Sequence, residues 1–203
     1  RDAHPRATQM RKQAVETMYK EKIGLLENRY AVSVEDPTTL DSVDPANALA
    51  FLKGAGKVAL MLGKPAMALP FFRRARDFSN EDPDVLLGLG EAYLATGASA
   101  DAAPFLKEVL RYQPSSQVHY LLGKLAFSES RMKDCVEETS QALVLRQEYL
   151  DALLLQARCL RSLRQDSREG KVLERAYKIA PDRREVVEEL VAYHMHTELG
   201  LPG

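Results

Sequence analysis

Small residues recur along this chain at a nearly constant interval, and this period constrains the fold more than any other feature. From Gly56, steps of 34, 33 and 34 residues lead to Gly90, Gly123 and Ala157. Three further series keep the same register: Ala75, Val109, Ala142 and Ala176; Ala68, Ala102 and Cys135, lapsing at Glu169; and the loop series Gly63, Gly97, Ser130 and Arg164. A fixed period of this length predicts an array of stacked supersecondary units.

Each unit has the pattern of two helices joined by a short turn. In the second unit, Asp82-Pro83 combines an N-cap with a proline at the first helical position, and apolar residues then recur at helical spacing. Gly97 ends that helix, Ser99 caps the next one, and Pro114 ends it because proline disfavours continuation of a helix. Two prolines inside predicted helices, Pro70 and Pro104, are 34 residues apart and share the register of the repeat. The expected fold class is therefore all-α.

The repeat resembles the tetratricopeptide repeat (TPR) family, in which Leu-Gly and Tyr mark helix A, and a small residue, an aromatic and a closing proline mark helix B. The second unit matches best, with Leu86, Leu89-Gly90, Tyr93, Gly97, Ala102 and Pro114. The other units keep Leu52, Gly56, Ala68 and Phe72; Leu122-Gly123 and Ala142; and Ala157, Ala176 and Pro181. The resemblance covers roughly residues 46–199. It implies a right-handed superhelical solenoid of about four helix pairs, of the bacterial adaptor or scaffold type.

The chain divides into three predicted segments. Residues 1–32 are an N-terminal segment whose amphipathic helix covers 7–32, residues 33–45 are an acidic linker, and residues 46–203 are the array with its C-terminal capping helix. The N-terminal helix is expected to bury Met10, Ala14, Met18, Ile23, Leu26 and Tyr30. It serves as a packing helix, an oligomerisation helix or a stalk below a membrane anchor. The capping helix, 184–199, is expected to bury Val187, Leu190 and Val191 and to stop at Gly200 and Pro202.

Composition excludes some classes and leaves the compartment open. Hydrophobic residues make up 45% and charged residues 28%, as in globular proteins, and a net charge of −1 gives no reason to expect nucleic-acid binding. The longest apolar run is far shorter than the ~18 residues of a membrane span. The chain begins at Arg1 rather than Met, so a tag, signal or anchor is one expectation for the region upstream. We favour a soluble, cytoplasmic protein, with the periplasm or a membrane surface as alternatives.

Gly54, Gly56 and Lys57 raise the question of a phosphate-binding loop. Such a loop needs GxxxxGK followed by Ser or Thr at a strand-to-helix turn, but Val58 follows here and no strand precedes it. Gly56, Gly90 and Gly123 are instead expected where helices cross closely, because a side chain would hold the helices apart.

No catalytic or cofactor-binding constellation is present, so the chain is expected not to be an enzyme and to hold no cofactor or metal. His194 and His196 point roughly 200° apart on a helix, and His194 with Glu198 supplies only two ligands. Cys135 and Cys159 are interpreted as small core residues, with an oxidised pair across the unit interface as the alternative.

The resemblance places helices A along a concave groove. Carried over by register, the inward positions are Lys53, Lys57, Leu60, Leu87, Glu91, Leu94, Tyr120, Lys124, Phe127, Leu154, Arg158 and Arg161. Five of these are basic and one is acidic, so the groove is expected to bind an acidic and apolar peptide or protein surface. The carboxylate clamp of chaperone-binding members is not expected, because Lys57 and Gly88 stand where that clamp needs asparagines.

The expected function is therefore a non-enzymatic protein-interaction adaptor with a protein or peptide partner. Two alternatives remain: a self-assembling scaffold on a membrane or organelle surface, similar to the magnetosome-associated TPR proteins, and a membrane-anchored assembly factor. A homo-oligomer belongs to the first alternative, and membrane contact would come only through an anchor or a partner.

The acidic linker carries one further hypothesis. Its carboxylates Glu35, Asp36 and Asp41 are tethered next to the predicted inward lysines Lys53 and Lys57. A short tether gives a high effective concentration, so the linker is expected to cover that end of the groove. The alternative is a solvated spacer.

Overall fold

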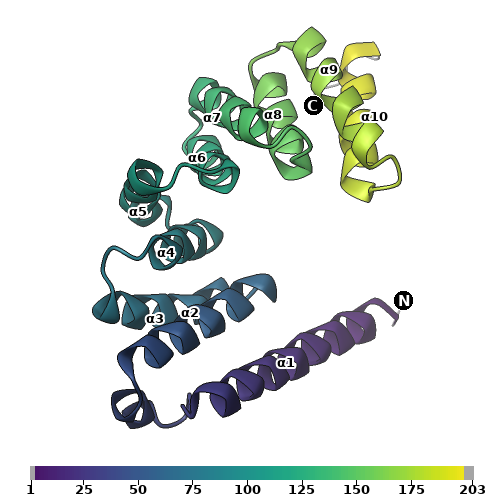
Figure 1. Cartoon of the computed structure of the whole chain (residues 1–203). Helices are drawn as coiled ribbons and strands as arrows, with labels where there is room; N and C mark the ends of the chain where they lie inside the picture. The colour runs from purple at the N-terminus through teal and green to yellow at the C-terminus, as the bar shows by residue number, and fades with distance from the viewer. Residues whose placement is uncertain (1–2, 199–203) are drawn as a thin grey trace. The chain divides into compact units, whose positions relative to one another are not determined.

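The structure, a computed structural model, describes residues 3–198. Within these residues the chain forms ten α-helices and one short 3-10 helix, with no strand (Figure 1), which confirms the all-α prediction. The expected stop signals Gly200 and Pro202 lie outside the described residues. The chain divides into two compact units, one ending at Ala98 and one beginning at Ser99, and each is described by itself.

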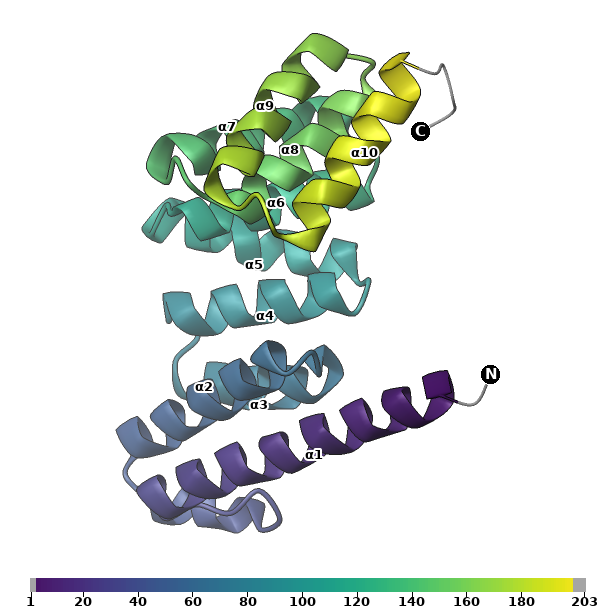
Figure 2. The same ribbon diagram turned by 90° about the vertical axis from the view of Figure 1, so that its right-hand side faces the viewer.

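The first unit contains a long helix followed by three helices of the array. Its elements are α1 (Ala3–Tyr30), the 3-10 helix η1 (Pro37–Ser42), α2 (Pro45–Met61), α3 (Pro65–Phe78) and α4 (Pro83–Ala95). Asp44 and Asp82 are the N-caps of α2 and α4, and each accepts hydrogen bonds from backbone N–H groups of the first turn. The predicted Asp-Pro helix starts are therefore confirmed. Helix α1 packs alongside α2 (Figure 2).

The second unit contains six helices. They are α5 (Ser99–Tyr112), α6 (Ser116–Ser128), α7 (Met132–Leu145), α8 (Leu150–Ser162), α9 (Asp166–Ile179) and α10 (Arg184–Glu198). Each packs on the next along the chain, and α6 also contacts α8. Three of the four predicted helix pairs, α2–α3, α6–α7 and α8–α9, pack within one unit, whereas α4 and α5, the predicted second pair, belong to different units. Pro70 and Pro104 lie inside α3 and α5.

Two of the repeat glycines, Gly56 and Gly123, lie at close helix crossings, as does Gly88. Phe72 is fully buried on α3, and its ring lies against both Gly56 and Gly88. A Cβ atom would be 2.7 Å from this ring at position 56 and 2.3 Å from it at position 88. At Gly123 a Cβ atom would be 3.0 Å from Cγ2 of Thr139. The packing prediction is confirmed for Gly56 and Gly123, whereas Gly88, which meets the closest contact, was not predicted.

The loop series ends four helices in the same way. Gly63, Gly97, Ser130 and Arg164 all have left-handed backbone, with φ of 68°, 81°, 58° and 56°. In each case the next residue donates its N–H to a carbonyl five residues back, as Arg131 does to Ala126 at 2.8 Å. This is the Schellman arrangement, which satisfies the last carbonyls of a helix and favours glycine. The repeat therefore extends to backbone conformation even where the glycine is absent.

Replacing Ser130 with glycine should raise the free energy of unfolding by about 1 kcal/mol. A side chain in left-handed backbone costs ~1–2 kcal/mol, and the gain is partly offset by the greater freedom of glycine in the unfolded chain. The reciprocal change at the equivalent position, Gly97→Ser, should lower stability by a similar amount in urea unfolding. An unchanged or lowered stability for Ser130→Gly would contradict this account.

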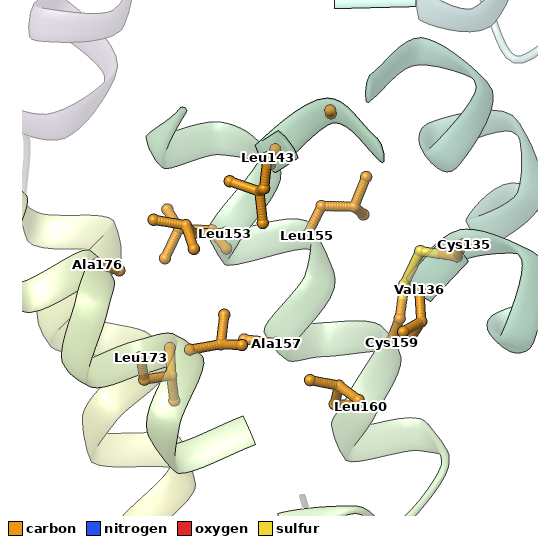
Figure 3. Close-up of a cluster of buried hydrophobic side chains, with 14 of the residues drawn as sticks. Cys135, Val136, Leu143, Leu153, Leu155, Ala157, Cys159, Leu160, Leu173 and Ala176 are labelled. Atoms are coloured by element: carbon orange, nitrogen blue, oxygen red, sulfur yellow. A yellow bond between two sulfur atoms is a disulfide. The ribbon is translucent and has the colours of Figure 1, made fainter. Parts of the chain in front are cut away.

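A disulfide joins α7 to α8. Cys135 and Cys159 are fully buried, and their Cα atoms are 6.4 Å apart, within the range of disulfides (Figure 3). Val136 and Leu160 are neighbouring members of the same core cluster. The cysteines are small core residues as predicted, and the alternative of an oxidised pair is the state found in the structure.

Among the α1 side chains that the structure describes, residues 8–30, the buried ones lie in the C-terminal half. Tyr19 and Ile23 are buried, whereas Met10 and Met18 are 68% and 44% exposed. The prediction that Met10, Ala14 and Met18 lie on a buried stripe is therefore wrong. For Met10 the reason is length: α1 has 28 residues and α2 has 17, so at ~1.5 Å per residue its N-terminal part extends beyond its neighbour. Met18 directly precedes the buried Tyr19, so it points about 100° away from the packed side of the helix.

Candidate functional site

The predicted groove residues form two faces, one in each unit. The first face consists of Lys53, Lys57 and Leu60 on α2 with Leu87, Glu91 and Leu94 on α4. The second face consists of Tyr120, Lys124 and Phe127 on α6 with Leu154, Arg158 and Arg161 on α8. Residues three and four apart on a helix share one side, and α2 contacts α4 as α6 contacts α8. Within each unit, the register therefore brings the predicted residues onto adjoining helices.

The lysines of the first face are paired with carboxylates at the start of α4. The Nζ atom of Lys53 lies 2.8 Å from Asp82 and 2.8 Å from Asp84, and Nζ of Lys57 lies 3.3 Å from Asp84. Burial disfavours the charged form of Lys53, but its hydrogen bonds to both aspartates outweigh this and raise its pKa. The hydrogen bond from Lys53 lowers the pKa of Asp84. Much of the positive charge of this face is thus used to hold α2 to α4.

The acidic linker lies elsewhere than predicted. Asp41 is 3.3 Å from Arg74 on α3, Asp36 caps η1, and Asp44 caps α2. Leu40 is buried, so η1 packs on the unit rather than extending as a spacer. The hypothesis that the linker carboxylates cover Lys53 and Lys57 is therefore wrong.

The α6 side of the second face combines aromatic rings with an available cation. Tyr120, Lys124 and Phe127 are all partly exposed. The Nζ atom of Lys124 lies 5.8 Å from the ring centroid of Tyr120, within the range of a cation–π contact. Among the described residues, no carboxylate forms an ion pair with Lys124. This is the part of the predicted groove whose charge is available to a ligand.

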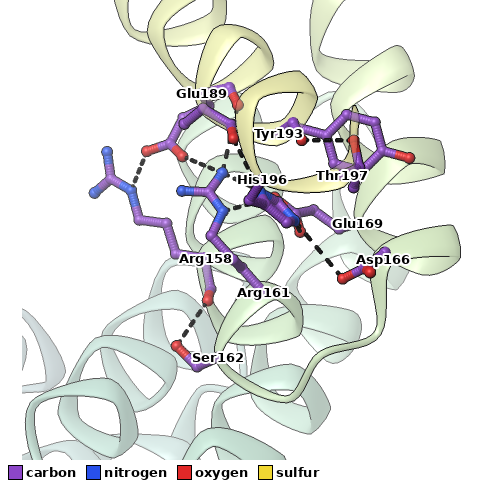
Figure 4. Close-up of polar contacts among 10 residues, drawn as sticks. Arg158, Arg161, Ser162, Asp166, Glu169, Glu189, Tyr193, His196 and Thr197 are labelled. Carbon is purple, nitrogen blue, oxygen red and sulfur yellow. Dashed lines mark hydrogen bonds and ion pairs between the residues drawn. The ribbon is translucent and has the colours of Figure 1, made fainter. Parts of the chain in front are cut away.

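The α8 side of the second face is largely occupied by the capping helix. Arg158 pairs with Glu189 on α10, and Arg161 lies 2.9 Å from Glu189 and 2.8 Å from Glu169 on α9 (Figure 4). Leu154 is only 6% exposed and belongs to the core cluster. The arginines therefore fasten α9 and α10 to α8, and only Arg158 remains well exposed.

The capping helix buries a different stripe from the one predicted. Val186 and Glu189 are buried, while Val187 and Val191 are 43% and 52% exposed. The prediction that Val187 and Val191 are buried is thus wrong. Glu189 points inward because Arg158 and Arg161 of α8 neutralise its carboxylate there.

Glu169 marks the lapse in the small-residue series of helix B. It is fully buried, and burial raises the pKa of its carboxyl group, although the hydrogen bond from Arg161 acts in the opposite direction. A charged residue where the repeat expects a small one was the only signal in the sequence for this polar cluster, and its partners on α8 and α10 were missed.

Comparison with known proteins confirms the predicted family resemblance. Residues 59–125 match the tetratricopeptide repeat family profile. A search of the curated proteins found no match. The chain is similar to the crystal structure of MamA, with 19% identity and a TM-score of 0.61 over 71% of this chain and 85% of that one. It is also similar to a thermophilic TPR protein from Thermus thermophilus, with 18% identity and a TM-score of 0.60 over 90% of this chain and 100% of that one.

A third similar structure is YrrB, described as a TPR protein with an unusual peptide-binding site. It shares 14% identity with a TM-score of 0.58 over 73% of this chain and 77% of that one. At such identities the likeness is one of fold. In the part of the chain that the structure describes, no helix has the length and apolar character needed to span a bilayer.

Proposed function

We propose that this chain, whose residues 59–125 match the tetratricopeptide repeat profile, is a non-enzymatic adaptor that binds an acidic and apolar segment of a protein partner on its second face. The ligand site is centred on Tyr120, Lys124 and Phe127 of α6, with the exposed guanidinium of Arg158 beside it. The first face has a mainly structural role.

The observation that carries this proposal is the state of Lys124. Of the basic residues placed in the groove by register, Lys53, Lys57, Arg158 and Arg161 are ion-paired, whereas Lys124 contacts an aromatic ring and no carboxylate among the described residues. An aromatic pair flanking a cation suits a peptide with an acidic side chain between apolar ones. Aromatic anchors supply most of the energy of such interfaces, and the charge supplies specificity.

A random-peptide display library selected on the purified chain should yield ligands rich in Asp or Glu next to Leu or Phe. Lys124→Glu should weaken the best of these peptides by at least about tenfold, since it replaces attraction by like-charge repulsion. Added salt should weaken binding to the wild type, because exposed charges are screened over ~8–10 Å. Lys133→Glu is the matched control: Lys133 is an exposed lysine of the same unit on α7, outside the second face. Equal losses for both variants, or selected peptides with no acidic residue, would contradict the proposal.

The second candidate function is a self-assembling scaffold, and the exposed apolar side chains of α1 favour it. Met10, Met18 and Leu25 are 68%, 44% and 70% exposed on one helix. Sedimentation velocity of the same samples separates the two functions: an adaptor sediments as a monomer across the concentration range, whereas a scaffold sediments faster as concentration rises.

A further inference from the structure

Three potential metal ligands from two helices face one another at the C-terminal end of the second unit. Asp166 and Glu169 are three residues apart in the first turn of α9, and His196 lies on α10 (Figure 4). Nε2 of His196 is 3.7 Å from Oδ1 of Asp166 and 3.4 Å from Oε2 of Glu169. One ligand atom from each residue lies within 4.8 Å of the other two.

The hydrogen bond at Nδ1 of His196 determines which ring nitrogen has a lone pair that can bind an ion. Nδ1 of His196 is 2.9 Å from the carbonyl oxygen of Ala192, and a carbonyl only accepts, so Nδ1 carries the proton. In the neutral ring Nε2 then has a free lone pair, directed toward two carboxylate oxygens. The other ring nitrogen of a metal-binding histidine usually donates to a carbonyl in this way.

Two of the three ligand atoms are buried without a hydrogen-bond partner. Glu169 is fully buried and the side chain of His196 is 5% exposed, yet neither Oε2 of Glu169 nor Nε2 of His196 has a hydrogen-bond partner among the described residues. Arg161 reaches the other oxygen of Glu169, Oε1, and the carboxylate of Glu189. A buried polar atom without a hydrogen-bond partner costs stability. A cation bound between Oε2 of Glu169 and Nε2 of His196 would satisfy both atoms.

We propose that Asp166, Glu169 and His196 bind a divalent transition-metal ion of the Zn²⁺ class. Zinc binds histidine nitrogen and carboxylate oxygen at ~2.0–2.2 Å, so ligands in tetrahedral geometry lie about 3.4 Å apart. The observed 3.4 Å and 3.7 Å are close to this separation. The imidazole selects zinc or its neighbours over Mg²⁺ and Ca²⁺, which prefer oxygen ligands alone.

The surroundings complete the site. A surface cavity of about 190 Å³, lined by Arg161, Ser162, Arg164 and His196, borders the histidine, and Asp166 is exposed on the other side of the cluster, so both lie next to solvent. Arg161 holds Glu169 through Oε1 and leaves Oε2 for the metal. Because its ligands come from α9 and α10, the ion fastens the capping helix to the last helix pair.

The test is titration of the chelator-treated full chain with Zn²⁺ by calorimetry, with Mg²⁺ as the comparison ion. We expect one Zn²⁺ per chain, no detectable Mg²⁺ binding and a higher melting temperature with Zn²⁺, since an ion bound only by the folded state stabilises it. His196→Gln and Asp166→Asn should each weaken Zn²⁺ binding at least about tenfold, because loss of an outer-sphere partner alone costs ~10–100-fold. Asp166 is an exposed residue, so its variant should fold even if His196→Gln does not.

The matched control is His194→Gln, because His194 lies on the same helix but is exposed and bonded to Glu198. It should bind Zn²⁺ as the wild type does. Binding of Co²⁺ gives a second readout, a visible absorption band that His196→Gln and Asp166→Asn should remove and His194→Gln should retain. The proposal is overturned if the folded wild type binds no Zn²⁺, binds Mg²⁺ equally well, or loses binding in His194→Gln but keeps it in Asp166→Asn. In the first case, the contact between His196 and Glu169 is an interaction within the protein and not a metal site.

Discussion

Replacing Phe72 with alanine should lower the free energy of unfolding by about 3–5 kcal/mol, at the upper end for a core substitution. Phe72 is fully buried, and its ring fills the space between Gly56 and Gly88. Neither glycine has a side chain that could move into the vacated volume, so the cavity should persist. Urea unfolding followed by circular dichroism measures the loss.

The same ring makes the effect of Gly88→Ala depend on residue 72. In the wild type the added Cβ atom would lie 2.3 Å from the ring, so overpacking should cost about 1–3 kcal/mol. In the Phe72→Ala background the space is free, and alanine should stabilise the helix by up to ~1 kcal/mol because it is the better helix former. If Gly88→Ala has the same effect in both backgrounds, the ring does not fill the crossing as described.

These glycines show how far the repeat pattern predicts the packing. The period located Gly56 and Gly123 at helix crossings, and it placed Ser130 and Arg164 where glycines of the loop series stand. It did not indicate Gly88, which lies outside all four series. Gly88 is close to Phe72 because two A helices meet the same B helix, and such a meeting depends on three helices that are distant in sequence.

The register predicted which side of each helix carries the candidate residues, but it did not predict which of their charges are paired. The register gave the helix side on which Lys53 and Lys124 lie. It could not show that Asp82, predicted as an N-cap, also binds Lys53, since one carboxylate can do both. Likewise, Glu189 becomes a partner of Arg161 only when α10 packs on the array. Ion pairs across helices depend on tertiary packing, whereas spacing rules describe only neighbours within one helix.

Replacing Arg161 with methionine should lower the free energy of unfolding by about 3–5 kcal/mol, the cost of leaving a buried charge without its partner. Arg161 donates to Glu169 at 2.8 Å and to Glu189 at 2.9 Å, and these carboxylates are 0% and 8% exposed. Methionine has similar bulk but no donor, so packing is largely kept while Glu169 loses its only hydrogen-bond donor among the described residues.

The matched control for this change is Arg158→Met on the same helix. The side chain of Arg158 is 48% exposed and pairs with Glu189 alone, so its loss should cost no more than about 1 kcal/mol. Adding Glu169→Gln to Arg161→Met should recover part of the lost stability, because it removes the unpaired buried charge. Urea unfolding in the presence of a chelator, with hydrogen exchange of α10 as a local readout, measures both effects. If Arg161→Met and Arg158→Met were equally stable, or if Glu169→Gln lowered stability further in the Arg161→Met background, the capping helix would not be held by this pair of buried carboxylates.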